Sequence, residues 1–280
     1  MILVTGATGT VGSETIKALK TKTVDFKAGS RQVGPARAQL GVETVAWDWD
    51  QPQGFAEALR GVDTLFLLTP AGTLKELDDG LAAVDAAQAA GVKKIVKLSA
   101  IGVESNPASP HRQIELAIER GPFQWVFLRP SFFMQNLAEG MLADVKAGVL
   151  ALPTGDSKTG FIDAGDIGAV AAETLTRPDW DGQGLTLTGP QALSWGQVAA
   201  TLTQALGRPV RHDDIAPEAF KSRLLVAGLP GHYAEFMTTL YGFVKAGYVA
   251  TVTDAVKQVL GREPGDLAHY AQGHRAALNA

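Results

Sequence analysis

The sequence predicts an α/β fold in which a doubly wound parallel sheet is followed by a smaller, mainly helical C-terminal lobe. Three observations predict it. Short apolar runs alternate with helical patterns up to about residue 135, a glycine-rich turn joins the first apolar run to a helix, and the alternation ends beyond Arg129. Strands that are separated by helices pair in parallel through right-handed crossovers, so the sheet should carry helices on both faces.

The elements of the first part follow from apolar periodicity. The first strand is the run at residues 2–4, and a helix follows the glycine-rich turn. Further strands are expected at 23–28, 44–47, 64–68, 94–99 and 125–128, and helices at 55–60 and 74–90.

The pattern changes beyond Arg129. Residues 161–167 are typical of a strand end and a helix start, where Asp163 or Asp166 is suited to capping a helix that runs through Thr174 back onto the sheet. In the rest of the chain, the sequence pattern predicts a Ser194-capped helix over 195–206, an extended segment around Val210, and helices that begin at Pro217, His232 and Thr253.

The turn after the first strand is the most informative feature of the chain. Gly6 permits a tight turn, Gly9 lets the backbone approach a pyrophosphate, and Gly12 lets the helix press against the strand. The spacing is G-x-x-G-x-x-G rather than G-x-G-x-x-G, and a bare structural turn is the alternative. The turn is typical of a Rossmann dinucleotide site, with expected contacts at Gly6, Thr8, Gly9, Thr10, Val11 and Gly12.

We therefore expect an NAD(P)-binding Rossmann domain at 1–150, with 160–188 returning to it, and a substrate-binding lobe at 189–280. Large apolar side chains of this lobe should cover the carboxyl ends of the strands, where ligands of open α/β sheets bind. These side chains are Trp195, Phe220, Leu224, Leu225, Phe236, Met237, Tyr241, Phe243 and Tyr248.

Composition excludes several classes of function. The formal net charge is −4 and the basic residues are scattered, so we expect no nucleic-acid partner. The chain has no cysteine, so disulfides and thiolate nucleophiles are excluded, and we expect no metal site. No apolar run approaches the length of a membrane span, and the opening strand leaves no room for a signal peptide, so we expect a cytoplasmic protein without membrane contacts.

The residues at the end of the second strand determine whether NAD or NADP binds more tightly. A carboxylate there would accept hydrogen bonds from the ribose hydroxyls of NAD, whereas Ser30 and Arg31 offer donors to a 2′-phosphate. The expected cofactor is therefore NADP(H). The alternative for Arg31 is a solvated surface side chain.

Two further strand ends should border the cofactor. Asp48 follows the third strand and could accept a hydrogen bond from the adenine amino group, whereas Asp50 is more suited to capping a turn before Pro52. Thr69 and Pro70, at the end of the fourth strand, should lie beside the ribose and pyrophosphate.

The fifth strand and the helix after it contain the candidates for catalysis. Ser99 is expected beside the nicotinamide, or alternatively satisfies a strand-end backbone group. His111 lies four residues before Glu115 at helical spacing and could position a substrate or relay a proton, although a histidine near a helix start can equally be structural.

With these residues placed, the chain resembles the NmrA-like atypical short-chain dehydrogenases over nearly its whole length. The resemblance rests on residues 5–12, 30–31, 98–100 and 128–136, and the last of these matches the family's Leu-Arg-Pro…Phe-x-x-Asn signature. It implies cofactor contacts for three residues of that signature: Pro130, Phe132 and Phe133.

Within that family the chain is most similar to the festuclavine dehydrogenase-like branch of ergot alkaloid pathways and its bacterial relatives. The matching residues are 48–49, 160–167, 228–230, 254–256 and 261–264. This resemblance implies NADPH-dependent reduction of an iminium ion or a similarly electron-poor double bond.

One departure from ordinary short-chain dehydrogenases limits the mechanism. Their Tyr-x-x-x-Lys pair belongs on the helix between the fifth and sixth strands, and here that helix has neither residue. Tyr241 and Lys245 have the spacing but lie in the second lobe, where we interpret it as a coincidence of helical periodicity and Tyr241 as a packing or pocket residue.

The leading hypothesis is an NADPH-dependent reductase that positions the nicotinamide against a small aromatic or heterocyclic acceptor that is already electrophilic. The chain would act as a monomer or homodimer. An NAD(P)-sensing regulator without catalysis, which the family also contains, is the alternative. A nucleotide-sugar epimerase fits less well, because it needs the absent tyrosine and lysine.

Overall fold

The computed structural model describes residues 1–279, which form two compact units. The first comprises 1–130 and 164–186, and the second comprises 131–163 and the chain from Leu187 onward. Residues 131–150 thus lie with the second unit rather than with the first, where we expected them. The reason is local: Ile162 N–H donates to Phe132 O at 2.9 Å and Met134 N–H donates to Ile162 O at 2.8 Å, so the residues after Pro130 pair with a segment of the second unit.

The first unit is built on the expected doubly wound sheet, which has seven strands in the order β3-β2-β1-β4-β5-β6-β9. Every pairing from β3 to β6 is parallel. The chain reverses its direction across the sheet between β1 and β4, the switch point at which open α/β sheets bind ligands. The strands are β1 Ile2–Val4, β2 Phe26–Ser30, β3 Thr44–Ala46, β4 Thr64–Leu67, β5 Lys94–Leu98, β6 Gln124–Pro130 and β9 Gln183–Leu187.

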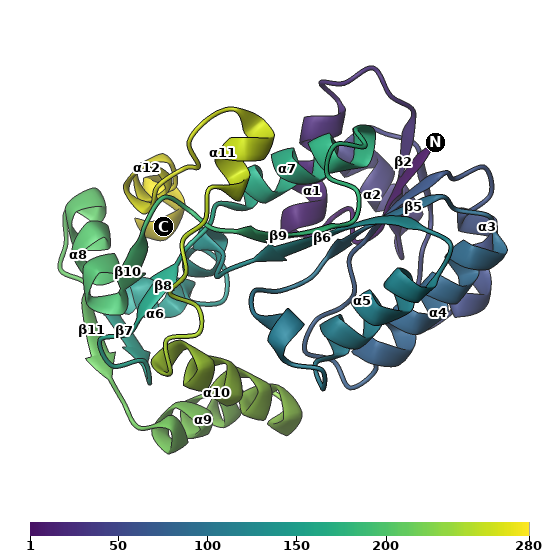
Figure 1. Ribbon diagram of the computed structural model, residues 1–280. Helices are drawn as coiled ribbons and strands as arrows, with labels where there is room; N and C mark the ends of the chain where they lie inside the picture. The colour runs from purple at the N-terminus through teal and green to yellow at the C-terminus, as the bar shows by residue number, and fades with distance from the viewer. Residues whose placement is uncertain (280) are drawn as a thin grey trace. The chain divides into compact units, whose positions relative to one another are not determined.

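Helices cover both faces of this sheet (Figure 1). One face carries α1 and α7, which pack closely on each other, and the other carries α4 and α5. The helical elements of the unit are α1 Thr10–Leu19, α2 Val33–Leu40, η1 Pro52–Gly54, α3 Phe55–Ala58, α4 Glu76–Ala89, η2 Val103–Ser105, α5 Pro110–Arg120 and α7 Ala164–Thr176.

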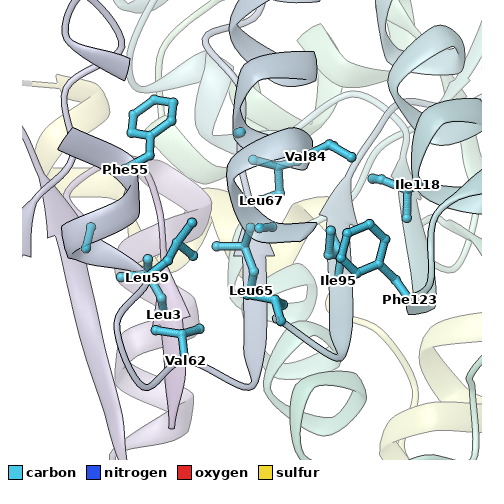
Figure 2. Packing of buried hydrophobic residues seen from close by; sticks show 14 of the residues in the cluster. Leu3, Phe55, Leu59, Val62, Leu65, Leu67, Val84, Ile95, Ile118 and Phe123 are labelled. Atoms are coloured by element: carbon cyan, nitrogen blue, oxygen red, sulfur yellow. The ribbon is translucent and has the colours of Figure 1, made fainter. Parts of the chain in front are cut away.

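A buried apolar cluster joins the strands to α3, α4 and α5 (Figure 2). Alternate residues of the central strands, Leu3, Leu65 and Ile95, are fully buried against this face. Lys97 comes two residues after Ile95, so it points to the same face at the carboxyl end of the sheet. A charged side chain therefore occupies the last position of an otherwise apolar stripe.

The second unit combines short strand pairs with helices. Strand β7 pairs in parallel with β11, and β8 pairs with β10 in antiparallel fashion. Its strands are β7 Val149–Leu152, β8 Lys158–Gly160, β10 Ala192–Ser194 and β11 Arg211–Asp214. Its helical elements are η3 Met134–Leu137, α6 Leu142–Ala147, α8 Trp195–Leu206, α9 Pro217–Val226, α10 Gly231–Lys245, α11 Ala255–Leu260, α12 Leu267–Gly273 and α13 Arg275–Asn279.

The Ser194 cap of α8 is confirmed as a complete capping box. The Gln197 backbone N–H donates to Ser194 Oγ at 3.2 Å, and Ser194 N–H donates to Gln197 Oε1 at 2.8 Å.

The second strand begins at Phe26 and ends at Ser30, later than the expected 23–28. Helix α2 was not expected, because Gly34 and Pro35 lie in its first turn.

Candidate functional site

The glycine turn has the close backbone packing that its sequence predicts. Gly6 has a φ of +57°, which a residue with a Cβ rarely adopts. A Cβ on Gly12 would lie 2.1 Å from Gly6 O and 2.8 Å from Ala7 Cα, so only glycine lets α1 approach the turn so closely. Gly9 N–H donates to Gly6 O at 2.9 Å and closes the turn.

Helix α1 begins at an exposed part of the turn. Gly9 is the N-cap in an extended conformation, with φ −79° and ψ 175°, and as a glycine it has no side chain with which to cap the helix. Thr8 and Gly9 are exposed. The first-turn N–H groups and the positive end of the helix dipole favour an anion at such a position. This observation fits the pyrophosphate of a dinucleotide.

The strand ends nearest the turn place the expected selectivity residues at the surface. Arg31 directly follows β2 and is exposed, and Ser30 Oγ accepts a hydrogen bond from Gln32 N–H at 3.2 Å. Asp48 Oδ1 accepts from Asp50 N–H at 3.1 Å and Oδ2 from Gln51 Nε2 at 3.1 Å. The turn cap expected of Asp50 is therefore formed by Asp48, and Asp50 instead pairs with Lys75.

Ser99 is part of a buried ionic network at the end of β5. Its Oγ donates to Glu115 Oε1 at 2.6 Å, not to the backbone. Arg129 from β6 binds the same carboxylate with two nitrogens, Nε to Oε1 at 3.0 Å and Nη2 to Oε2 at 2.9 Å, and Arg112 adds a bond to Oε2 at 2.9 Å. The Leu-Arg-Pro signature thus anchors β6 to α5.

This network keeps Glu115 ionised. Burial alone would raise the pKa of Glu115, but the hydrogen bonds from Arg129 and Ser99 and the charge of Arg129 together lower it below its ordinary value. Because the Ser99 proton is directed at a carboxylate, Ser99 Oγ can offer a ligand only its lone pairs.

A second buried cluster lies at the starts of α4 and α5. Lys97 Nζ lies 2.9 Å from His111 Nδ1 and donates to Leu98 O at 2.9 Å. His111 Nε2 lies 3.3 Å from Glu76 Oε1. Glu76 also accepts hydrogen bonds from Thr69 Oγ1 at 3.3 Å and from the N–H of Gly72 at 3.1 Å. The histidine therefore bridges a lysine and a carboxylate.

Burial shifts all three groups of this cluster. It lowers the pKa of Lys97 to about 8, although the charges of Glu76 and Glu115 oppose that shift. Burial, assisted by the Lys97 charge, lowers the pKa of His111 well below its ordinary value. Burial also raises the pKa of Glu76, against the hydrogen bond from Gly72. A pH dependence near the ordinary histidine pKa, which free His111 would give, is therefore not expected of this side chain.

The second unit contains Phe132, Phe133 and the Tyr241–Lys245 pair that has the Tyr-x-x-x-Lys spacing. Tyr241 is buried with its ring 5.9 Å from Phe132 and 5.0 Å from Phe220, and burial raises its pKa. Lys245 pairs with Asp214 instead, at 3.8 Å. Phe133 forms a parallel bridge with Ile162. Tyr241 is thus a packing residue of this unit's aromatic cluster.

Sequence reasoning missed Lys97, Glu76 and the role of Arg129. Lys97 had a signal in the sequence, because it lies in a predicted strand whose other residues are mostly apolar.

Within residues 1–279, no group of three or more histidine, aspartate or glutamate side chains is arranged to hold a metal ion. No helix in the same range combines the length and apolar character that a membrane span needs.

The doubly wound sheet, with a glycine turn between its first strand and first helix, is the architecture of the Rossmann class of dinucleotide-binding proteins. The NmrA-like family model matches residues 1–271, and the chain belongs to this family. It is 38% identical over 288 residues to NAD(P)H azoreductase from Xenophilus azovorans, with 100% of both chains covered. It is also similar to the structure of NADPH-dependent quinone oxidoreductase 2 from Escherichia coli with NADPH, with 25% identity, a TM-score of 0.87 and coverage of 98% of this chain and 99% of that one.

Festuclavine dehydrogenase from Aspergillus fumigatus is 32% identical over 295 residues, with 98% of both chains covered. This identity is lower than that to the azoreductase. The resemblance to the festuclavine branch is therefore part of a wider likeness within the NmrA-like family, and it does not single that branch out.

Proposed function

We propose that this chain uses NADPH to reduce small aromatic or heterocyclic acceptors that are already electrophilic, such as quinones, azo compounds and iminium ions. It is an NAD(P)H-dependent oxidoreductase of the NmrA-like family. The observation that carries the proposal is the glycine turn, in which Gly12 lets α1 lie against the backbone of Gly6 and the helix begins at the exposed Gly9.

The residues of the turn fit the cofactor. The first turn of α1 would hold the pyrophosphate, and Arg31 would meet a 2′-phosphate. Thr69, Pro70, Pro130, Phe132 and Phe133 are proposed to border the cofactor, and Asp48 to meet its adenine. The nicotinamide supplies hydride when bound. The protein's own contribution is then to orient the reactants and exclude water.

The side chains near β5 favour activated acceptors. Ser99 directs its proton at Glu115, so it is not available to protonate an acceptor. The helix that carries the tyrosine and lysine of ordinary short-chain dehydrogenases has neither. A ketone would need a proton on its developing alkoxide, whereas hydride addition to an iminium ion neutralises its charge directly.

Arg31→Ala should remove most of a preference for NADPH over NADH. A charge-assisted hydrogen bond to the 2′-phosphate contributes about 1.5–3 kcal/mol, or roughly 10- to 150-fold in affinity. Calorimetric titration of both cofactors measures it, with Arg37→Ala as the control, because Arg37 Nη2 donates to Thr44 O within the unit. Equal affinities of the unaltered protein for NADPH and NADH would contradict the assignment.

The acceptor class is tested by steady-state oxidation of NADPH. We expect turnover with a quinone, an azo dye and a cyclic iminium ion, and turnover at least about 100-fold slower with cyclohexanone, because its alkoxide is a much stronger base than the anion of a hydroquinone and forms at a greater cost in free energy. Efficient reduction of cyclohexanone would contradict the mechanism. Tight NADPH binding without turnover on any activated acceptor would favour the NAD(P)-sensing regulator.

A further inference from the structure

Lys97, His111 and Glu76 form a continuous polar chain inside the first unit. The three residues come from β5, α5 and α4 and meet at the carboxyl end of the sheet. Lys97 is fully buried and the Glu76 side chain is 6% exposed, whereas the His111 side chain is 18% exposed. Of these three side chains, His111 is therefore the one most exposed to solvent.

The geometry fixes where the histidine proton lies. A lysine ammonium can only donate, so His111 Nδ1 must accept from it, and the ring proton then lies on Nε2 and faces Glu76. His111 is in the first turn of α5, whose positive end further disfavours a charged imidazole. The 3.3 Å contact of Nε2 with Glu76 is longer than the 2.9 Å contact of Nδ1 with Lys97. Nε2–H is thus the ring group held less tightly.

We propose that Lys97 and Glu76 are positioning residues that hold His111 as its Nε2–H tautomer. The three side chains together then deliver one proton to an acceptor that has received hydride. The inference rests on the proposed function, because it supplies the proton that a reduced quinone or azo group takes up. An iminium ion or another cationic acceptor needs no such proton.

The proton balance is simple. Hydride addition turns a quinone into the anion of a hydroquinone. Its oxygen takes the proton from His111 Nε2, and Nδ1 takes one proton from Lys97 Nζ. Lys97 is left as a neutral amine and His111 stays neutral as the other tautomer. Solvent then returns one proton to the pair.

The charged groups around Lys97 set its response to pH. Glu76 faces it from α4, Glu115 from α5, and Arg129 of β6 is paired with Glu115. With its pKa lowered to about 8, Lys97 holds its proton at neutral pH and loses it as the pH rises through that value. Quinone reduction should fall over the same range.

The tautomer is tested directly by ¹⁵N NMR of histidine-labelled protein without cofactor, between about pH 6 and 9.5. We expect His111 to be neutral and protonated on Nε2 at neutral pH, with a shift change centred near the Lys97 pKa of about 8. Lys97→Arg should keep the tautomer and abolish the shift change, because arginine stays charged. Lys97→Met should mix the two tautomers. A charged His111 at pH 7, or unchanged tautomers in Lys97→Met, would overturn the proposal.

Turnover gives a second readout that separates this proposal from the proposed function. In Lys97→Met, the ratio of kcat with a quinone to kcat with a cationic triphenylmethane dye should fall at least about 10-fold, because only the quinone needs the proton. Lys94→Met, which alters a lysine of the same strand that pairs with Asp181, should keep the ratio. A smaller fall in Lys97→Met would overturn the relay. Failure of the unaltered protein to reduce either acceptor would contradict the proposed function, and the NMR measurement would still decide the tautomer.

Discussion

Gly9→Val is expected to weaken NADPH binding by at least about 100-fold, a loss of about 2.7 kcal/mol, while the chain stays folded. The backbone of Gly9 is extended, with φ −79° and ψ 175°, so valine meets no backbone strain there. The nearest atom to an added Cβ is Gly6 O at 3.3 Å, and Gly9 is exposed. The extra methyl groups therefore extend into the space that a pyrophosphate needs.

Fluorescence titration with NADPH measures this loss, and circular dichroism checks the fold. Gly34→Val is the matched control, because a Cβ on Gly34 meets no atom within 4 Å and the position lies in α2, away from the turn. The control should keep the affinity of the unaltered protein. Normal NADPH binding by Gly9→Val would mean that the turn has only a structural role.

Arg129→Met is expected to destabilise the protein by about 3–5 kcal/mol, because it removes one partner of a buried ion pair and leaves the other buried. Glu115 has no exposed side-chain surface and would lose both bonds from Arg129. Glu115 would keep the hydrogen bonds from Arg112 and Ser99 and the more distant charge of Lys97. Urea unfolding measures the difference in the free energy of unfolding.

The effect should also depend on pH. The pKa of Glu115 is lowered in the folded protein, so the stabilisation that it contributes is present above its unfolded pKa and is lost as the pH falls through the folded one. The difference between the two proteins should therefore shrink below about pH 4. Arg177→Met, at an arginine that is 53% exposed, is the control and should cost about 0–1 kcal/mol. An equal cost for both variants would contradict the role of the Arg129 pair.

The backbone of the glycine turn could be predicted from the sequence because its determinants are local. Gly6 must adopt a positive φ and Gly12 must avoid a Cβ clash, and both requirements lie within a few residues of the turn. The six predicted strands, β1 to β6, were likewise confirmed, because apolar periodicity reports them directly, whereas α2 was not predicted. The regular pattern did not reveal that the chain leaves the first unit after Pro130, because hydrogen bonds of Phe132 and Met134 with Ile162, which is distant in sequence, determine it.

The surroundings of the catalytic candidates depend on contacts between residues distant in sequence. Ser99 was considered for the nicotinamide or for a backbone group, and its bond to Glu115 requires the packing of α5 against β5. His111 was considered with Glu115 at helical spacing, whereas its contacts, Lys97 and Glu76, come from two other elements. The turn cap expected of Asp50 is formed by Asp48, because either carboxylate could cap that turn and Asp50 pairs with Lys75, a residue distant in sequence.

Hydride transfer to carbon is the central claim, and one isotope measurement tests it directly. The protein is mixed with a cationic triphenylmethane dye and NADPH that carries deuterium at both C4 positions of the nicotinamide. Hydride addition to the central carbon gives a colourless product without a proton-transfer step, so any deuterium there comes from the cofactor. We predict loss of the dye colour together with NADPH oxidation, and one deuterium per molecule of product by mass spectrometry. A product without deuterium, or no oxidation of bound NADPH, would contradict the account.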